Sequence, residues 1–491
     1  MTRSVGLPDQ PIADTATAAR GTRHTALAQV LVQAVRLGTS IVLARMLAPD
    51  AFGVVALASV VALFLDQVKD MGTGSVIIQR ESVDQTLLSS VFHLNLVLGM
   101  LLAAGLYVTA DPLAVLLGDL RVGPVLQVLA GVTLVGALGQ VHHSLLRRQL
   151  RFGTIAAITA TAAVVTAAVS IVLAVLGAGY WALVVGLVAG TCTSTVLVWL
   201  RDPWRPSLVV SLTSLRSIWG YSLHLFLSNL TFLFFNQVDK VIVGRLLGTS
   251  ALGVYSMAQR TVMSPVSSVG QTVQEVTFPS FSRRQDDNPA LASAFIRSGR
   301  AIGAVTMPAM VGLAVLATPA VDVVFGAKWG DLVPVIWILA PVAAVLSISS
   351  SSADLMLAKG RSDISFRWGL VYCVALTSLE LVGSRWGVVG VAAAFAAGIA
   401  VLVPIGLHLA FRLVDLRVTT FARALAPQAA ITATMGLATF LVSQGVAMAG
   451  GGTLAQLVLG TVAGVVVYGG LLHVCRPAVV DDLRLGLRRG A

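Results

Sequence analysis

Long apolar runs alternate with short polar segments along nearly the whole chain of 491 residues. A helix needs about 20 residues to cross a hydrocarbon core of ~30 Å. Runs of that length recur at 25–45, 51–73, 87–110, 122–146, 153–176, 179–200, 219–244, 250–276, 291–318, 331–357, 363–383, 387–411, 422–446 and 453–475. The pattern predicts an all-α polytopic membrane protein with about 14 transmembrane helices.

The composition and the distribution of cations agree with this class. Hydrophobic residues make up 56% of the chain and charged residues only 11%, whereas soluble domains carry roughly 25% charged residues. The net charge is +11, but the cations are unevenly placed between spans. One side of the membrane receives 24 of them, and the other receives Arg45, Arg121, Arg245, Lys328 and Arg385. This asymmetry predicts that both termini are cytoplasmic, and it explains the positive charge without nucleic-acid binding.

A sequence repeat divides the chain. Residues 43–58 read LARMLAPDAFGVVALA and residues 243–258 read VGRLLGTSALGVYSMA, with six identities and no gap. We call these segments the first and second copies of the repeated turn. Six predicted spans separate them, so the halves are expected to be parallel repeats. Each copy is predicted to be a short extracytoplasmic turn in which Gly53 or Gly253 permits close helix packing.

The repeat and the spans together predict the domain layout. We expect a disordered cytoplasmic tail at 1–24, an N-lobe of six helices at 25–200, an interfacial linker at 201–218, a C-lobe of six helices at 219–415, two accessory helices at 416–475 and a cytoplasmic tail at 476–491. The linker carries Trp204 and apolar residues between its cations, which is typical of a helix lying on the membrane surface. The accessory pair is expected to face lipid.

Signatures of catalysis are missing from the sequence. It has no phosphate-binding loop, no nucleophile elbow and no zinc-protease motif. The three cysteines lack metal or disulfide spacing, and the pair His142–His143 is interpreted as an ordinary interfacial feature. We therefore expect neither an enzyme nor a metal site.

Polar side chains line four predicted spans beside the repeated turns. A charged group within lipid is costly, from about 2.5 kcal/mol upward, so such residues usually face a cavity or a partner. Substrate-binding candidates are Arg36, Arg260, Gln33, Asn229, Asn236 and Gln259; coupling or gating candidates are Asp66, Lys69, Asp70, Asp239, Lys240 and Glu275. Asp66, Lys69 and Asp70 share one helix face, which predicts a mutually neutralising cluster. The pattern leaves open whether that cluster is a latch or an ion site.

Several motifs resemble a known transporter family. They are LARMLAPDAFGVVALA, DMGTGSVIIQR, NQVDKVIVGRLLGTSALGVYSMAQR and VTFPSFSR, which occur in this order over about 25–415. The chain resembles the polysaccharide transporter (Wzx/WzxC-type) family of the multidrug/oligosaccharidyl-lipid/polysaccharide exporter superfamily. The resemblance implies a V-shaped, two-lobe, MATE-like flippase in a bacterial cytoplasmic membrane. It implies alternating access for polyprenyl-pyrophosphate-linked oligosaccharides and work beside a polysaccharide polymerase and export machinery, without a bound cofactor.

Two arginines suggest how such a substrate is held. Arg36 lies 12 residues before residue 48, and Arg260 lies 12 residues after residue 248. Neither has an acidic neighbour within one helical turn in the sequence. Because arginine binds phosphates in a bidentate manner, we expect the two to hold a pyrophosphate. Proton or sodium coupling through the acidic candidates is a further expectation.

Other functions fit the sequence less well. The nearest alternative is a lipid II flippase, followed by a cation-coupled multidrug exporter. A membrane-embedded glycosyltransferase or polymerase needs a larger external loop than those predicted here, and a scaffold has no use for arginines within the membrane. The sequence does not identify the glycan or the coupling ion.

Overall fold

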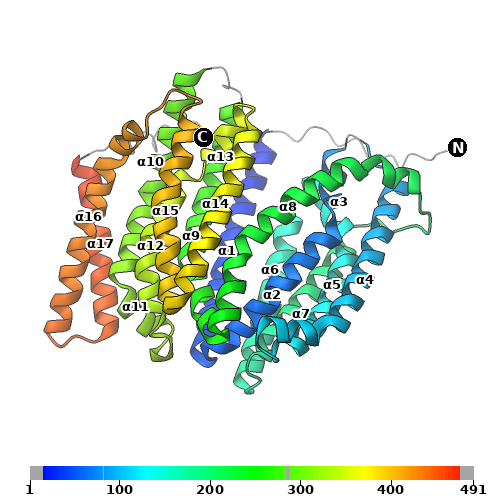
Figure 1. Ribbon diagram of the computed structural model, residues 1–491, viewed down its shortest axis with the longest axis horizontal. Coiled ribbons are helices and arrows are strands. Elements are labelled where there is room, and N and C mark those ends of the chain that lie inside the picture. The colour runs from blue at the N-terminus through cyan, green and yellow to red at the C-terminus, as the bar shows by residue number, and fades with distance from the viewer. Residues whose placement is uncertain (1–14, 81, 283–286, 476–491) are drawn as a thin grey trace. The chain divides into compact units, whose positions relative to one another are not determined.

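The structure is a computed structural model that describes residues 15–80, 82–282 and 287–475, and over these residues it contains helices and no strand (Figure 1). Ten segments are long and apolar enough to cross a membrane by length and composition. The prediction of an all-α membrane protein is confirmed at this level. The chain divides into two compact units between Gly253 and Val254, and each unit is described by itself.

The first unit contains eight helices and the beginning of a ninth. They are α1 (Thr15–Met46), α2 (Pro49–Asp70), α3 (Thr73–Gln79), α4 (Gln85–Leu117), α5 (Val122–Arg148), α6 (Phe152–Val175), α7 (Trp181–Arg201) and α8 (Leu212–Leu247), and α9 (Thr249–Ser282) crosses the unit boundary. Helix α1 packs on α6, α6 on α7, α4 on α5, and α2 on both α5 and α8.

Local sequence explains where these helices begin and end. Pro49 stands at the start of α2, where its missing N–H costs no hydrogen bond. Helix α2 ends because Met71 and Gly72 adopt left-handed backbone conformations, with φ of 44° and 73°. Helix α4 begins at an N-cap, because the Asp84 carboxylate accepts a hydrogen bond of 2.9 Å from the Leu87 N–H.

Small residues allow the helices of this unit to approach closely. A Cβ atom added at Gly186 would lie 1.8 Å from Ser170 Oγ, and one added at Gly190 would lie 2.0 Å from Thr166 Oγ1. Helices α6 and α7 therefore meet along a face that only glycine can occupy. This is the packing mode expected where lipid removes the hydrophobic drive for helix association.

Both copies of the repeated turn have the predicted local form. The first separates α1, which ends at Met46, from α2, which begins at Pro49. The second separates α8, which ends at Leu247, from α9, which begins at Thr249, and its Gly248 adopts a φ of 88°. Each copy is a turn of one or two residues between two long helices.

The second unit contains the remaining helices. They are α10 (Asn288–Val315), α11 (Ala317–Val324), the 3-10 turn η1 (Ala327–Trp329), α12 (Leu332–Ser349), α13 (Ser352–Ala358), α14 (Ser362–Gly383), the 3-10 turn η2 (Ser384–Trp386), α15 (Gly387–Phe411), α16 (Val418–Met448) and α17 (Thr453–Cys475). Helix α10 packs against α12 and α16, α14 against α15, and α16 against α17, and the last pair lies side by side in Figure 1.

An aromatic core ties α16 into the second unit. The Phe295 ring lies 5.0 Å from that of Phe411 and 5.2 Å from that of Phe421, between ring centroids. Gly299 leaves room for the Phe421 ring, which would lie 2.8 Å from an added Cβ atom. Helix α16 thus buries one face in protein, so the expectation that both accessory helices simply face lipid is wrong for α16. Helix α17 fits it better, because Gly460 and Gly464 are its only buried residues.

Two further expectations need correction. The tail predicted at 1–24 is helical from Thr15 onward, because α1 begins there; residues 1–14 lie outside the described residues, as does the tail at 476–491. The linker is not a surface helix, since residues 202–211 carry no helix and α8 begins at Leu212. Its side chains are held instead by contacts with α4, α5 and α7, described below.

Candidate functional site

Three charged residues at the end of α2 form two separate contacts. The Lys69 ammonium donates to Asp66 Oδ1 at 2.8 Å. Asp70 Oδ1 instead accepts from the Gln140 amide at 2.8 Å and from the Gly74 N–H at 3.1 Å. The predicted neutralising cluster therefore consists of one ion pair and one carboxylate held by neutral donors.

The ion pair is unevenly buried. The Lys69 side chain is only 6% exposed, whereas the Asp66 side chain is 52% exposed. Two glycines make room for the buried ammonium: an added Cβ atom would lie 3.0 Å from Lys69 Nζ at Gly136, and 3.9 Å from Lys69 Cδ at Gly99. The lysine stem thus runs between α4 and α5, and its partner Asp66 retains an accessible carboxylate.

A neutral pair continues the polar interior of this unit. Thr73 Oγ1 and the Asn95 side-chain amide lie 3.3 Å apart, and both residues are buried. Asn95, Gln140 and Gly136 were not among the residues predicted from the sequence. In the sequence they are isolated positions within apolar helices and form no polar stripe. Only their contacts with α2 and α3 in the structure show that they belong to this polar interior.

The candidates on α8 and α9 have partners that differ from the expected ones. Asp239 is 8% exposed and accepts a hydrogen bond of 2.8 Å from the backbone N–H of Lys240. The Lys240 ammonium donates to Gln237 Oε1 at 2.8 Å, so a glutamine overlooked in the sequence takes part. Gln259 on α9 donates to the fully buried Tyr255 hydroxyl at 3.2 Å.

The remaining substrate-binding candidates are on accessible helix faces. Arg36, Arg260 and Asn236 are exposed, and Gln33 and Asn229 are half-buried. Arg36 belongs to the first unit and Arg260 to the second. The side chain of Glu275 lies outside the described residues. Within the described part of the chain, no cluster of histidine, cysteine and carboxylate groups could hold a metal ion.

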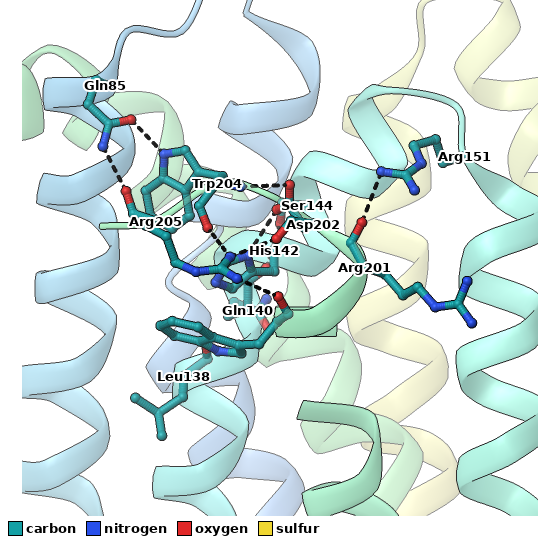
Figure 2. Close-up of polar contacts among 11 residues, drawn as sticks. Gln85, Leu138, Gln140, His142, Ser144, Arg151, Arg201, Asp202, Trp204 and Arg205 are labelled. Carbon is teal, nitrogen blue, oxygen red and sulfur yellow. Dashed lines mark hydrogen bonds and ion pairs between the residues drawn. The ribbon is translucent and has the colours of Figure 1, made fainter. Parts of the chain in front are cut away.

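A buried histidine–aspartate pair anchors the linker to the first unit (Figure 2). His142 Nδ1 lies 2.9 Å from Asp202 Oδ2, and the two side chains are 0% and 1% exposed. The His142 ring sits beside Trp199 and Trp204, at centroid distances of 4.6 and 5.2 Å. The interpretation of His142 as an interfacial residue is therefore wrong, because α7 and the linker cover it.

Hydrogen bonds extend this anchor along the linker. The Trp204 indole N–H donates to Gln85 Oε1 at 2.7 Å, and the Gln85 amide donates to the Arg205 carbonyl at 2.8 Å. The Arg205 guanidinium donates to the Asp202 carbonyl at 2.7 Å and lies over the Trp199 ring at 5.4 Å. Trp204 thus fastens the linker to α4 rather than to the membrane surface.

We predict that removing Asp66 destabilises the protein more than removing Lys69. Asp66→Ala leaves a buried ammonium without its carboxylate, which costs about 3 kcal/mol or more, whereas Lys69→Met leaves a carboxylate that water already reaches. Denaturant titration in detergent measures both. The double variant should recover much of the stability that Asp66→Ala loses. Equal losses in Asp66→Ala and Lys69→Met would contradict the burial argument.

Gly136→Ala should also lower the stability of the protein. The matched variant Gly131→Ala should not, because nothing lies within 4 Å of an added Cβ atom there. Equal stabilities of the two glycine variants would contradict the burial argument.

We predict that the His142–Asp202 contact holds the linker in place. His142→Ala and Asp202→Ala should increase hydrogen exchange of peptides covering residues 202–211, because each removes the buried bond that fixes Asp202. His143→Ala is the matched control, since His143 lies 3.3 Å from Ser194 on α7 rather than beside the linker. Unchanged exchange in both test variants would show that the linker is held by its other contacts.

Comparison with known proteins gives the sequence relatives. A family model described as "Polysaccharide biosynthesis protein" matches residues 42–334. The teichuronic acid biosynthesis protein TuaB of Bacillus subtilis is 27% identical over 78% of this chain and 80% of its own length. The succinoglycan biosynthesis transport protein ExoT of Rhizobium meliloti is 29% identical over 76% of each chain. The lipopolysaccharide biosynthesis protein WzxC of Escherichia coli is 26% identical over 76% of this chain and 77% of its own length.

Solved structures give the fold. An inward-facing multidrug resistance MATE family transporter of the MOP superfamily matches with a TM-score of 0.62, at 18% identity, over 79% of this chain and 94% of its own. The likeness at this identity establishes a MATE-like fold. The family model covers more than half of the chain, and the chain therefore belongs to the polysaccharide biosynthesis protein family.

Proposed function

We propose that this protein is a flippase that moves polyprenyl-pyrophosphate-linked oligosaccharide repeat units across the bacterial cytoplasmic membrane by alternating access. The observation that carries the proposal is the extent of the match to TuaB, ExoT and WzxC, which spans about three quarters of both chains in each case. Their names refer to the biosynthesis of teichuronic acid, to transport in the biosynthesis of succinoglycan, and to the biosynthesis of lipopolysaccharide. By this likeness we propose that the present protein serves the biosynthesis of a surface polysaccharide.

The proposed architecture has fourteen transmembrane helices in two lobes. The N-lobe is 25–200 and the C-lobe is 219–415, with 416–475 as accessory helices and both termini in the cytoplasm. The ten apolar helices support a multipass protein. Helices α1, α8 and α9 lie outside that set, and α8 and α9 carry polar and charged side chains such as Asp239 and Arg260. Helices that line an aqueous path are expected to have this composition.

Arg36 and Arg260 are proposed to bind the head group of the substrate. Each arginine lies 12 residues from the centre of its own repeated turn, which corresponds to a depth of roughly 18 Å at about 1.5 Å per residue. Both side chains are exposed at the protein surface, so a ligand can reach them. A guanidinium forms two parallel bonds with a phosphate, and one arginine from each lobe would hold the pyrophosphate while the prenyl chain stays in lipid.

Energy coupling is proposed to use the carboxylates near this path. Asp66 keeps half of its side chain accessible while Lys69 fixes one of its oxygens. A carboxylate in that position can take up a proton or a sodium ion and so change its attraction for the lysine. Asp70, Asp239 and Glu275 are further candidates for the same role.

We predict that the purified protein, in proteoliposomes, moves a polyprenyl-pyrophosphate oligosaccharide to the opposite leaflet. Arg36→Ala and Arg260→Ala should each reduce the rate of this transport at least about 100-fold, because each removes a charge-assisted bidentate contact. Arg→Lys should restore part of the rate. Protein abundance is the control. Normal transport by the double alanine variant would contradict the clamp, and failure of the unmodified protein to move any such lipid would contradict the flippase.

The same vesicles distinguish the competing substrates and test coupling. Lipid II and a cationic dye replace the oligosaccharide in separate experiments, and faster movement of either one would reassign the function. Imposed proton and sodium gradients, applied one at a time, should accelerate transport if the carboxylates couple it. A rate that responds to neither gradient would remove the coupling role.

We predict that Arg385 lies outside the cell and Arg147 lies inside, on the basis of the positive-inside asymmetry. Arg385→Cys, in a chain whose three native cysteines are replaced, should react with an impermeant maleimide in intact cells, and Arg147→Cys should react only after lysis. Both side chains are exposed, so differences in burial do not affect the comparison. The opposite labelling pattern would invert the topology.

A further inference from the structure

The two copies of the repeated turn contact each other at their glycines. A Cβ atom added at Gly53 would lie 1.7 Å from the carbonyl oxygen of Thr249, and one added at Gly253 would lie 1.8 Å from that of Pro49. All four residues belong to the first unit. No side chain fits at either glycine, because the obstructing atom in each case is backbone.

The contact is reciprocal. Pro49 and Thr249 occupy equivalent positions 200 residues apart, and so do Gly53 and Gly253. Each copy offers its glycine to the backbone carbonyl of the other, as in a two-fold interface between identical surfaces. Beside it, Gly244 faces Leu57, whose Cδ1 would lie 2.8 Å from an added Cβ atom, and both Leu57 and Leu252 are fully buried. The contact is therefore dry and closely packed at its centre.

An arginine from the loop between α4 and α5 connects the two copies at their exposed edge. Arg121 Nη1 lies 2.8 Å from Asp50 Oδ2 in the first copy, and Arg121 Nη2 donates to Thr249 Oγ1 at 3.0 Å in the second copy. Asp119 Oδ2 binds Arg121 Nη2 at 2.8 Å and accepts from the Thr249 hydroxyl at 2.9 Å. One guanidinium thus joins residues that are far apart in the chain.

The Asp119 carboxylate of this network stays ionised near neutral pH. Burial disfavours the charged form of Asp119, but hydrogen bonds from the Arg121 side chain, the Arg121 backbone N–H and Thr249 outweigh it, so the pKa of Asp119 lies below its ordinary value of 3.8. A lowered pKa means that the stabilisation is complete above pH 3.8 and is lost only as the pH falls further. A physiological proton gradient therefore leaves the Asp119 carboxylate charged.

The network is also accessible to water. The side chains of Arg121 and Asp50 are 42% and 41% exposed, and exposed ion pairs of this kind hold weakly. When the two copies of the repeated turn separate, the groups that become exposed are already partly hydrated. The glycine contact beneath them re-forms in only one register. The combination allows repeated opening and accurate closing.

We propose that the paired copies of the repeated turn form the extracytoplasmic gate, with Gly53 and Gly253 as its seat and Arg121 as its latch. This inference rests on the proposed flippase function, since a substrate that leaves on that side must pass between the repeats. It goes further by naming the residues that close the exit. Arg121 acts here as a positioning residue and does not touch the substrate.

A reversible cross-link tests whether the contact has to open. Asp119→Cys and Thr249→Cys, introduced together in a chain without the three native cysteines, should be joined by a short bis-methanethiosulfonate cross-linker, which attaches to each thiol through a reducible disulfide, because the native side chains lie 2.9 Å apart. Transport of the lipid-linked oligosaccharide should fall about tenfold or more and should return on reduction. In each single-cysteine variant, the transport rate should be the same with and without the cross-linker.

The outcomes separate the gate from the flippase itself. A cross-linked protein that transports at the uncross-linked rate would overturn the gate and leave the flippase standing. Failure of the cross-link to form in membranes would overturn the contact. An uncross-linked protein that moves no lipid-linked oligosaccharide would instead refute the proposed function.

Glycine variants test the seat without a transport assay. With Thr249→Cys as the only thiol, Gly53→Ala and Gly253→Ala should each raise its reaction rate with an impermeant maleimide about tenfold, because the added methyl group pushes the copies apart and shifts the population toward the open form. Arg121→Gln should do the same to a smaller degree. Gly38→Ala is the matched control, since nothing lies within 4 Å of an added Cβ atom there. Equal rates in all four variants would overturn the proposal.

Discussion

Close helix packing at glycine is the interaction on which the rest of this structure depends. In lipid, apolar surface gains little by leaving its surroundings, so helices associate through close packing and hydrogen bonds. The chain uses glycine in this way between α6 and α7, between α4 and α5 and between the two copies of the repeated turn, where an added Cβ atom would come within 2.0, 2.8 and 1.8 Å of a neighbour. Each of these sites restricts the helix register, because a side chain at the contacting position would clash with the neighbouring helix.

Close packing also decides where charge can be buried. Lys69 lies inside the first unit because Gly136 and Gly99 leave space for its stem, and its charge is balanced by a carboxylate that water still reaches. A larger residue at Gly136 would press on the ammonium, because an added Cβ atom there would lie 3.0 Å from Lys69 Nζ. The glycines therefore act through electrostatics as well as through packing, and the polar interior of the unit depends on positions that carry no chemistry of their own.

Periodicity predicted the helices well, because hydrophobic length is a local property of the sequence. The repeat alignment likewise placed both turns, at Met46–Pro49 and Leu247–Thr249. The linker was mispredicted because its apolar residues between cations imitate an amphipathic helix. Its actual conformation depends on His142 and Gln85, which are 60 and 119 residues away from their partners Asp202 and Trp204. Partners of that kind, like Gln140 for Asp70, leave no signal in a single sequence.

The repeat also explains why the two ends of the first unit are built so differently. At the linker, fully buried groups and aromatic rings make a contact that is costly to break, because separating His142 from Asp202 would leave two buried polar groups without partners. At the repeated turn, half-exposed charges lie over a contact between backbones, and separation leaves no charge buried alone. A duplicated turn can supply such a contact because each copy presents the same glycine and the same carbonyl to the other. In the proposed transport cycle, the linker therefore stays fixed to the first unit, and the contact at the repeated turn is the one that opens on its side of the membrane.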